Sequence, residues 1–523
     1  MPNEIQMNGM RRKGRCHKNQ LPVTKKTISL LYFTGILLLL SSCATSKHST
    51  YNPAAKIPAA KLQEDFSLLK KILEANHPSL YWYTPKDSVD IYFNEVMQSI
   101  NDSLTEIQFK NKVAWFISKI KCGHTSVRPS IAYSDYAIAH KQPRFPLLIK
   151  TWNDSLIFLG SLNKQDTLFK RGTVITSIEN YDNRTLLDSL FRFISTDGHG
   201  DNFKSQAVSF NFPLYYSFAF PLKDSFFVRY IDSGIEKQTY VQLNKPFIDI
   251  SKSKKTPAAV TPPKPSRKQI KQIMLVSKRS MIFDSVNNLA YMRLATFSGG
   301  NLRRFFRQSF KELHENKLSN LVIDLRENSG GNINMSTLLT RYIKNKTFHT
   351  ADTAAAISRS FSYSRYIQPS FPYRMAMRFT TAKKKDGKFH FKQLEQHNCK
   401  PVKNIHYDGN VFIIQGGYTF SAAAMFVLQL KGQQNVTVTG EETGGGDYGT
   451  SAVYLPDIVL PNSKVRVVLP LYRLVFNSNK IKNGQGIAPD MYIPPSSVDI
   501  SKGIDPKLQR VKELIQEKNK KGL

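Results

Sequence analysis

The fold is decided by the run Leu321-Val322-Ile323-Asp324-Leu325-Arg326-Glu327-Asn328-Ser329-Gly330-Gly331, in which an apolar stretch leads into a polar turn with two glycines. An apolar stretch of this length predicts a strand buried on both faces, and the glycines predict a tight turn after it. Residues 411–415 predict a second buried strand, and residues 421–430 predict a helix directly after the next loop. Strand, glycine-rich turn and helix together predict a layered α/β domain.

The residues before this domain follow two other patterns. Apolar side chains recur at helical spacing in residues 62–73 and 109–120, which predicts two amphipathic helices. From residue 145 to 243 the pattern changes to short β-rich runs, and residues 171–178 resemble the part of a PDZ domain where a glycine turn leads into a strand. We therefore predict a mixed α+β and α/β multidomain fold, with an N-terminal helical domain, a PDZ-like β-rich domain and a layered α/β core.

The changes of pattern also predict where the parts of the chain begin and end. The parts are a signal peptide at 1–42, a tether at 43–60, an N-terminal helical domain at 61–130, a PDZ-like domain at 145–250, a basic proline-rich linker at 251–272, an α/β core at 280–497 and a basic C-terminal tail at 498–523. The linker is predicted because residues 251–271 hold four prolines and seven basic residues but no acid, a composition that cannot build a core.

The charge of the chain bears on its partners. The formal net charge is +35 at pH 7, which is unusual for a soluble enzyme and raises the question of nucleic-acid binding. No recognisable nucleic-acid motif accompanies the charge, and the basic residues concentrate in tails, a linker and one insertion. We therefore predict no nucleic-acid partner, and an affinity for anionic surfaces or acidic polymers as a side effect.

The N-terminus carries an export signal. Lys25 and Lys26 precede an apolar run at 28–40, which is short for a membrane span and typical of the core of a signal peptide. The end of this run, Leu40-Ser41-Ser42-Cys43, resembles a bacterial lipobox, in which the cysteine thiol is acylated and becomes the first mature residue. We predict lipidation at Cys43; an uncleaved signal anchor is the alternative.

Two further points about the termini and thiols stay open at this stage. The stretch before the signal is long, so translation from Met7 or Met10 is compatible with the same export signal. Cleavage before Cys43 leaves Cys122 and Cys399, and one pair of cysteines is no disulfide framework. Whether these two cysteines bond does not follow from the sequence.

Four separated segments, and a fifth near the end, carry the chemistry. They are Cys122-Gly123-His124-Thr125, residues 324–332, Tyr418-Thr419-Phe420-Ser421-Ala422-Ala423-Ala424, Gly440-Glu441-Glu442-Thr443-Gly444-Gly445-Gly446 and Gly486-Ile487-Ala488-Pro489-Asp490. In this order they resemble the tail-specific (C-terminal-processing) serine peptidase family, and more closely its branch similar to the tricorn protease core. The resemblance spans residues 61–495 and implies a peptidase that works by acyl transfer, with no metal or organic cofactor.

Ser421 is the candidate nucleophile. It stands between a predicted buried strand and the first turn of an apolar helix, where unpaired helix N–H groups carry partial positive charge. An oxyanion formed there is stabilised by such amides, including that of Ala422. The resemblance implies that the turn at Gly330 and Gly331 supplies a second amide. The ordinary alternatives are an N-cap serine and a plain strand-to-helix turn.

His124 is the candidate general base. Many tail-specific peptidases use a lysine some two dozen residues after the nucleophile, but no lysine occurs between Lys431 and Lys464. The resemblance to the tricorn-like branch implies a histidine instead, and His124 matches it. The pKa of an imidazole suits proton transfer near neutral pH. A histidine with a purely structural role is the alternative.

The acid that orients the histidine is harder to identify. Related tricorn-type proteins carry a glutamate near the final Pro-Asp segment, where this chain has Asn483, Gln485 and Ala488. Glu441 and Glu442 are the remaining candidates for a catalytic acid, and each is equally compatible with a role as a loop brace.

Two tempting features are set aside. The sequence Asp197-Gly198-His199-Gly200-Asp201 resembles a metal loop but lacks a second group of ligands, so we interpret it as a turn. Cys122 lies two residues from His124, but we interpret it as a buried, inert thiol. Asp324 and Arg326 are predicted to form an ion pair or a turn brace.

The sequence thus predicts a serine-type peptidase that cleaves unfolded or C-terminal polypeptide segments, with the PDZ-like part as receptor. The alternative is a catalytically silent, peptide-binding lipoprotein that kept the fold, motivated by the missing acid. The expected partners are a polypeptide substrate and a membrane reached through the lipid anchor. The expected location is the cell envelope, on the outer or inner membrane, facing the periplasm or the cell surface.

Overall fold

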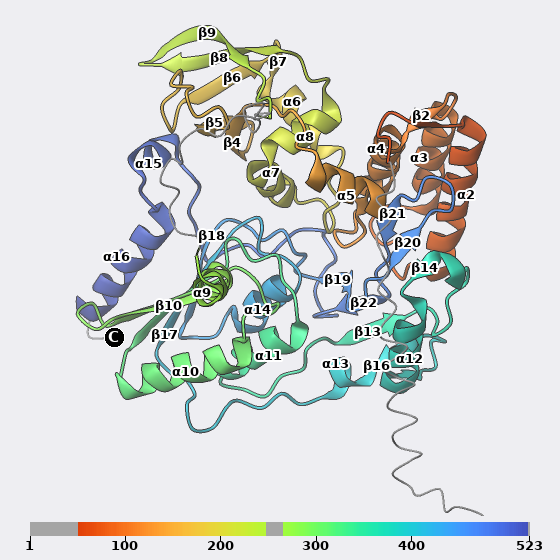
Figure 1. Cartoon of the computed structure of the whole chain (residues 1–523). Coiled ribbons are helices and arrows are strands. Elements are labelled where there is room, and N and C mark those ends of the chain that lie inside the picture. The colour runs from red at the N-terminus through yellow and green to blue at the C-terminus, as the bar shows by residue number, and fades with distance from the viewer. Residues whose placement is uncertain (1–50, 247–264, 521–523) are drawn as a thin grey trace, which may run out of the picture. The chain divides into compact units, whose positions relative to one another are not determined.

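The structure is a computed structural model that describes residues 51–246 and 265–520 (Figure 1). The predicted signal peptide, residues 43–50 of the tether, including Cys43, and residues 251–264 of the linker lie outside the described residues. None of the helices in the described ranges has the length and apolar character that a bilayer crossing requires.

The α/β core is built on a 6-stranded sheet with the order β10-β11-β12-β17-β18-β23. The strands are β10 (Arg279–Asp284), β11 (Leu289–Leu294), β12 (Asn320–Asp324), β17 (Asn410–Gln415), β18 (Val436–Gly440) and β23 (Met491–Tyr492). The β10 strand runs antiparallel to β11, and the other neighbours are parallel. Parallel strands are usually covered by helices on both faces, as the apolar runs predicted.

Helices cover both faces of this sheet. On one face are α10 (Leu302–Glu315), α11 (Ile333–Arg341) and α14 (Ala422–Leu430), and on the other is α16 (Pro506–Lys520). Leu321 and Ile323 pack in the cluster of the first face, whereas Val322 and Phe412 pack against Val511 of α16. Successive side chains of a strand point to opposite faces, so every residue of the apolar run in β12 is buried. The mixed α/β fold class is confirmed.

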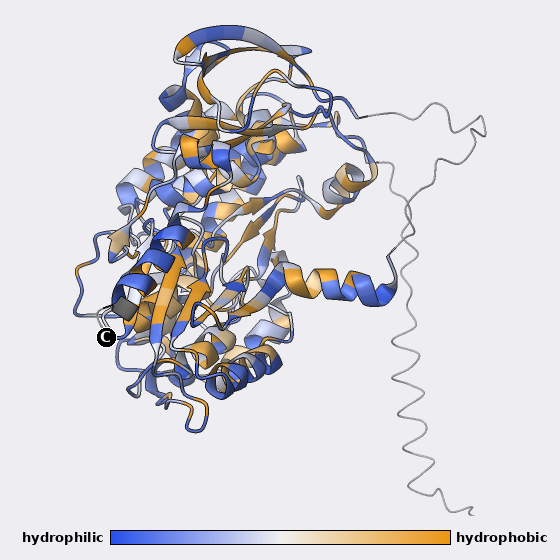
Figure 2. Ribbon diagram, turned by 90° about the vertical axis from the view of Figure 1, so that its left-hand side faces the viewer, coloured by the Kyte–Doolittle hydropathy of each residue, from blue (hydrophilic) through white to orange (hydrophobic). Residues whose placement is uncertain are grey.

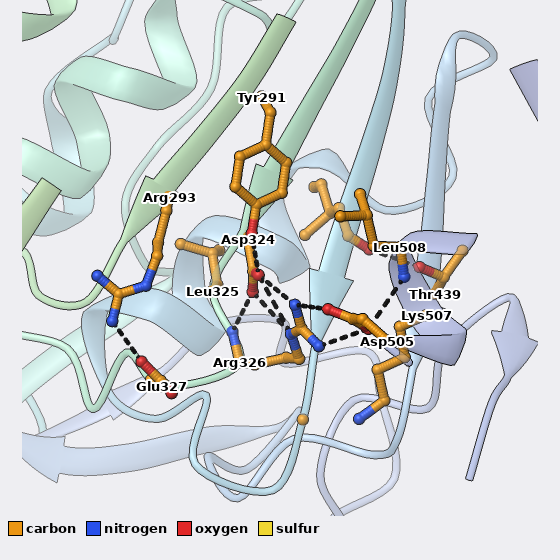
Figure 3. A network of polar contacts seen from close by, with 12 residues as sticks. Tyr291, Arg293, Asp324, Leu325, Arg326, Glu327, Thr439, Asp505, Lys507 and Leu508 are labelled. Atoms are coloured by element: carbon orange, nitrogen blue, oxygen red, sulfur yellow. Dashed lines mark hydrogen bonds and ion pairs between the residues drawn. The ribbon is translucent and has the colours of Figure 1, made fainter. Parts of the chain in front are cut away.

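The C-terminal residues differ from the expected basic tail. Residues 497–520 contain two helices, α15 (Ser497–Lys502) and α16, and the second completes the core. Figure 3 shows how it is held: Arg326 donates two hydrogen bonds to Asp505, of 2.9 and 2.7 Å, and also pairs with Asp324. Tyr291 donates to the same Asp324 carboxylate at 2.6 Å. The predicted ion pair of Asp324 and Arg326 is confirmed, and it connects the end of β12 to α16.

The N-terminal helices share one hydrophobic core with strands from the second half of the chain. The elements that come before the middle domain are β1 (Lys56–Ile57), α2 (Ala59–Asn76), α3 (Lys86–Ser99), β2 (Leu104–Thr105), α4 (Glu106–Lys119), β3 (Val127–Arg128) and α5 (Ile131–Ala139). Phe66 and Phe116 lie in one cluster with Val467 and Tyr472, and β3 pairs with β21. The helices therefore do not form a core of their own, because their apolar faces are completed by residues some 350 positions later.

Two smaller sheets complete this shared core. They have the orders β15-β16-β13-β22-β19 and β14-β20-β21-β3. Their remaining elements are β13 (Thr353–Ala356), β14 (Ile367–Gln368), α12 (Ser370–Thr380), β15 (Thr381–Lys383), β16 (Phe389–Phe391), α13 (Lys392–Gln396), β19 (Gly449–Ala452), β20 (Asp457–Val459), β21 (Arg466–Val468) and β22 (Tyr472–Val475). The predicted tether also ends early, since β1 pairs with β2 and α2 begins at Ala59.

The middle part of the chain is an antiparallel sheet with three helices. Its elements are β4 (Leu147–Trp152), β5 (Ser155–Ser161), β6 (Val174–Ile178), β7 (Tyr181–Asp182), α6 (Asn183–Phe191), α7 (Asp201–Phe210), α8 (Phe212–Ala219), β8 (Ser225–Asp232) and β9 (Ile235–Gln242). Its own cluster of buried side chains contains Phe145, Ile175, Phe212 and Phe226. The likeness to a PDZ domain stays a prediction.

The end of the predicted linker is helical. Residues 267–278 form α9 (Arg267–Lys278), which continues directly into β10. In Figure 2 this helix carries both apolar and polar residues, next to the grey trace of the undescribed segment. A capping box of Ser266 and Gln269 begins it, which explains why a stretch rich in proline and lysine turns helical at this point.

Candidate active site

Ser421 occupies the turn between β17 and α14. Its backbone has φ 53° and ψ −124°, a strained conformation for a residue with a side chain. The side chain makes no capping hydrogen bond to the helix, so Ser421 is not an ordinary N-cap serine. Instead, its Oγ lies 3.0 Å from Nε2 of His124. The structure therefore brings together the predicted nucleophile and the predicted base.

The turn of Ser421 packs directly on the glycine turn after β12. Thr419 donates its hydroxyl to the carbonyl of Leu325 at 2.8 Å, and the amide of Phe420 donates to the carbonyl of Asn328 at 3.1 Å. Gly330 has φ +101°, and a Cβ placed on it would lie 2.7 Å from the Cβ of Ser421. A side chain at this position would collide with the serine turn, so only glycine allows the close approach.

Two backbone amides beside Ser421 are available for an oxyanion. The N–H of Gly330 already donates to Asn328 Oδ1 at 2.9 Å. Among the described residues no acceptor takes the N–H of Gly331 or of Ala422, the first residue of α14. Gly331, Ser421 and Ala422 line the same cavity. Of the two predicted glycines, Gly331 is thus the candidate donor, whereas Gly330 provides the space.

His124 lies on a short loop after α4, held from several sides. Gly123 sits against the ring of Phe420, where a side chain would collide, and the His124 ring lies 4.9 Å from the same ring. The next residue, Thr125, is fully buried and hydrogen bonded to Nε2 of His77 at 2.8 Å. The loop is therefore fixed by packing, and the imidazole keeps one position opposite Ser421.

Thr450 and Asp197 stand behind the imidazole. The Oγ1 of Thr450, in β19, lies 3.2 Å from Nδ1 of His124 and 2.7 Å from Oδ2 of Asp197. The other oxygen of Asp197 accepts the amide of Gly123 at 2.9 Å. Both Asp197 and Thr450 are buried. A chain of hydrogen bonds thus runs from the serine through the histidine and the threonine to a buried carboxylate.

The direction of the protons in this chain follows from the groups themselves. An ionised carboxylate only accepts, so the single hydroxyl proton of Thr450 goes to Asp197. The oxygen of Thr450 then accepts the proton of His124 Nδ1, and this leaves the lone pair of Nε2 facing Ser421. Asp197 therefore selects the tautomer that a general base requires, although it does not touch the imidazole.

Burial shifts the pKa values of both ends of this chain. It lowers the pKa of His124 to about 4, so the imidazole is neutral near pH 7. It raises the pKa of Asp197 to about 6, against the opposing effect of hydrogen bonds from Thr450 and from the amides of Gly123 and Gly446. At neutral pH the histidine is thus an acceptor and the aspartate an anion, which are the states that base catalysis needs.

Glu441 and Glu442 lie elsewhere than the expected position of the orienting acid. Glu441 is buried and forms an ion pair with Lys507 of α16. Glu442 accepts the amide of Gly486 at 2.7 Å, which braces the loop before β23. Neither carboxylate is hydrogen bonded to His124, within the residues that the structure describes. The structure gives both glutamates the bracing role that the sequence left open.

Asp197 is the functional residue that sequence reasoning missed. It begins the segment Asp197-Gly198-His199-Gly200-Asp201, which was interpreted as a turn because it lacked further metal ligands. The turn is confirmed, since residues 198 and 199 form a turn. The amide of His199 also donates to the carbonyl of Gly484 at 2.8 Å. In the described ranges no three metal-binding side chains come together. The available signal was an acid in a tight glycine turn, but nothing in the sequence connects it to His124.

Cys122 and Cys399 are free and buried. Burial raises the pKa of the Cys122 thiol to about 11, which keeps it protonated at neutral pH. The interpretation of Cys122 as an inert thiol is consistent with this shift.

A cavity of about 400 Å³ opens beside Ser421. His124, Ser421, Thr450 and the turn at Gly331 line it, as do Asn334 and Gln393. The apolar side chains that line it are Phe391, Leu394, Met425, Tyr454, Leu455 and Phe476. A cavity of this kind fits an apolar side chain placed next to the reacting carbonyl.

Residues 288–493 match the family described as Peptidase family S41. No curated protein matches the chain by sequence.

Several solved structures have a similar fold. Mature CPAF complexed with lactacystin has a TM-score of 0.62 and 13% identity, covering 88% of this chain and 98% of that one. Mature CPAF alone has a TM-score of 0.61 and 12% identity, covering 88% and 97%. At these identities the likeness to CPAF is one of fold.

Proposed function

We propose that this chain, whose residues 288–493 form a peptidase family S41 domain, is a serine-type peptidase with Ser421 as nucleophile and His124 as general base. The observation that carries the proposal is the distance of 3.0 Å between Ser421 Oγ and His124 Nε2, with the serine side chain turned away from its helix. A nucleophile and base within hydrogen-bond reach, the base in turn oriented by a third group, are the signature of such a site.

The reaction follows from these positions. His124 Nε2 takes the hydroxyl proton as Ser421 Oγ bonds to the substrate carbonyl carbon, and the carbonyl oxygen becomes an oxyanion. The amides of Gly331 and Ala422 donate to this oxyanion. When the C–N bond breaks, the imidazolium returns its proton to the leaving amine, and an acyl-serine ester remains. His124 then deprotonates a water molecule, which attacks the ester carbonyl carbon. As the ester C–O bond breaks, the imidazolium returns that proton to Ser421 Oγ, and the new carboxylic acid leaves and ionises.

Thr450 and Asp197 support an active enzyme over the catalytically silent alternative. That alternative rested on the missing orienting acid, and these two residues supply an acid that acts on His124 through a hydroxyl. The positive charge that forms on the imidazole during the reaction is stabilised by the carboxylate in a buried, low-dielectric setting.

The substrate we propose is an unfolded or terminal segment of a polypeptide with an apolar side chain at the cleaved bond. Ser421 and His124 are partly buried, so a rigid folded surface cannot bring a peptide carbonyl to Ser421. An extended segment reaches the serine and places one side chain in the adjacent apolar cavity.

We also propose that the protein is exported and acylated at Cys43, which anchors it to a membrane of the cell envelope. The apolar run and Leu40-Ser41-Ser42-Cys43 support this, although these residues lie outside the described part of the chain. Mass spectrometry of the mature N-terminal peptide tests it: an unacylated mature N-terminus would reject the anchor.

Labelling with a fluorophosphonate tests the catalytic proposal. The reagent phosphonylates a serine only when the hydroxyl is activated, and peptide mapping is expected to find the adduct on Ser421. Ser421→Ala is expected to abolish labelling, whereas Ser285→Ala, at an exposed serine between β10 and β11, is expected to retain it. No labelling of a folded parent, or an adduct on another residue, would exclude Ser421 as the activated nucleophile.

A further inference from the structure

α9 has features that peptidase chemistry does not use. None of its residues is buried, although the helix contains isoleucine, methionine, leucine and valine side chains. Ile270, Ile273 and Met274 are 44%, 61% and 62% exposed. Residues at spacings of three and four lie next to one another on a helix, so these three form one apolar stripe. An unpartnered stripe of large apolar side chains in water is unfavourable and marks an interaction surface.

Basic residues flank the stripe. Arg267, Lys268, Lys271 and Lys278 belong to the same helix, and none of them pairs with an acid within the described ranges. The sequence from residue 251 to 283 contains nine lysines and arginines and no aspartate or glutamate. The partner of this surface therefore has to be both anionic and able to cover apolar side chains.

The helix is fixed to the core at its C-terminal end. Arg279 donates to the carbonyl of Gly300, and its guanidinium lies 4.3 Å from the centre of the Phe305 ring. The carbonyl of Lys278 accepts the amide of Ala295 at 2.9 Å. The last turn is thus bonded to the α/β core, while the turns that carry the apolar stripe have no such bonds to other elements within the described residues. A bound surface would therefore be rigidly connected to the catalytic core.

We propose that α9 docks the peptidase domain on an anionic lipid bilayer. The helix lies in the plane of the interface, with Ile270, Ile273 and Met274 among the acyl chains and its lysines and arginine among the headgroup phosphates. A bilayer satisfies both requirements at once. A nucleic acid or acidic polymer neutralises the charge but leaves the apolar stripe exposed, so it fits only half of the surface.

The docking does not depend on acylation of Cys43, because the stripe and its charges lie on the folded domain. Its experiment therefore uses a chain from Ala44 to Leu523, which contains the compact unit Asn52–Leu523 and lacks both Cys43 and the apolar run at 28–40. This chain is expected to sediment with vesicles that contain phosphatidylglycerol and to stay in solution with phosphatidylcholine vesicles.

Two double variants separate the contribution of the apolar stripe to vesicle binding from that of the basic residues. Ile273→Gln with Met274→Gln keeps good helix formers and the charge, and is expected to weaken binding to the anionic vesicles about tenfold or more. Lys268→Gln with Lys271→Gln is expected to weaken it by a similar factor. Ile282→Gln in β10, where the side chain is 59% exposed, is the matched control and is expected to bind like the parent.

Insertion itself has a direct measurement. A tryptophan placed by Met274→Trp is expected to shift its fluorescence to shorter wavelength with anionic vesicles and to be quenched by brominated acyl chains. Loss of binding only in the lysine variant, with the glutamine pair at 273 and 274 binding like the parent, would overturn the proposal in favour of a plain polyanion site. A change of oligomeric state in that glutamine pair, with vesicle binding unchanged, would instead assign the stripe to a protein partner.

Discussion

The two halves of the candidate site are built in different ways. The half that holds Ser421 is local: strand β17, a turn and helix α14 follow one another, and the turn packs on the glycine turn of residues 328–331. The half that holds His124 is assembled from three distant segments, with Asp197 on a loop before α7 and Thr450 on a strand of another sheet.

This difference separates what a motif can specify from what tertiary packing must supply. The nucleophile turn depends on residue types at fixed spacing, because one glycine makes room for the serine and an apolar helix follows. The base depends on hydrogen bonds across sequence separations of 326 and 253 residues. Substitution of Ser421 or His124 is therefore expected to remove the chemistry, whereas substitution of Asp197 or Thr450 is expected to misplace the base.

The largest effect is expected from His124→Gln. Glutamine keeps size and polarity but cannot accept the serine proton, so kcat/KM for an unstructured peptide is expected to fall by about 10⁴-fold or more. The thermal transition is expected to stay close to that of the parent. A folded variant with near-parental kcat/KM would show that another group is the base.

The next largest effect on activity is expected from Asp197→Asn. An asparagine amide that donates to Thr450 turns the hydroxyl proton toward His124 and favours the wrong imidazole tautomer, so kcat is expected to fall by about 10²-fold or more. In the parent, kcat/KM is expected to rise with pH around 6, where Asp197 ionises, because His124 is already neutral there. Asp197→Asn is expected to lose this rise of kcat/KM around pH 6.

The control for this charge change is Asp201→Asn, at an exposed acid a few residues further along the chain. It is expected to keep both the rate and the pH profile of the parent. A parental profile in Asp197→Asn would mean that the limb belongs to another group and that Asp197 does not orient the base.

A smaller effect is expected from Thr450→Val. Valine has the shape of threonine but cannot connect His124 to Asp197, so kcat is expected to fall about tenfold to a hundredfold. Thr450→Ser restores the hydroxyl and is expected to recover most of the rate. If the serine variant is as slow as the valine variant, packing at position 450 matters and the hydrogen-bond relay does not.

The smallest effect concerns stability. Burial raises the pKa of Asp197 from 3.8 to about 6, so the folded chain binds more protons than the unfolded chain between these pH values. The protonated carboxyl group of Asp197 therefore favours the folded state at low pH, and this stabilisation is lost as the pH rises from 3.8 to about 6. Asp197→Asn cannot ionise at this position. Its free energy of unfolding, relative to that of the parent, is therefore expected to rise by up to about 3 kcal/mol between pH 4 and pH 7, as measured by urea unfolding. A constant difference in the free energy of unfolding between variant and parent across this pH range would contradict the raised pKa of Asp197.

The sequence predicts the half of the site that holds Ser421 and part of the half that holds His124. The two buried strands, the helix after Ser421 and the tight turn at Gly330 and Gly331 follow from periodicity and glycine placement. The resemblance between separated segments gave His124 and an oxyanion donor in the glycine turn, although the N–H of Gly330 is taken by Asn328. Asp197 and Thr450 could not be predicted, because nothing in the sequence connects either residue to His124 and both depend on how distant segments pack.

The same limit explains the errors in the boundaries. The N-terminal helices were expected to form their own domain, but their apolar faces are completed by residues such as Val467 and Tyr472. Residues 498–523 were expected to be a basic tail, yet Val511 and Ile515 are buried against the central sheet. Amphipathic helices with few apolar residues look like solvated tails when their partner surface is unknown.

The position of α16 has a consequence for the timing of synthesis. This helix is the last in the described chain, and it covers the face of the central sheet on which Val322 and Phe412 lie. Until residues 505–520 have been made, α16 does not cover that face and Arg326 lacks its partner Asp505. We therefore expect ribosome-arrested chains that stop before Asp505 to be protease-sensitive and unreactive toward fluorophosphonates.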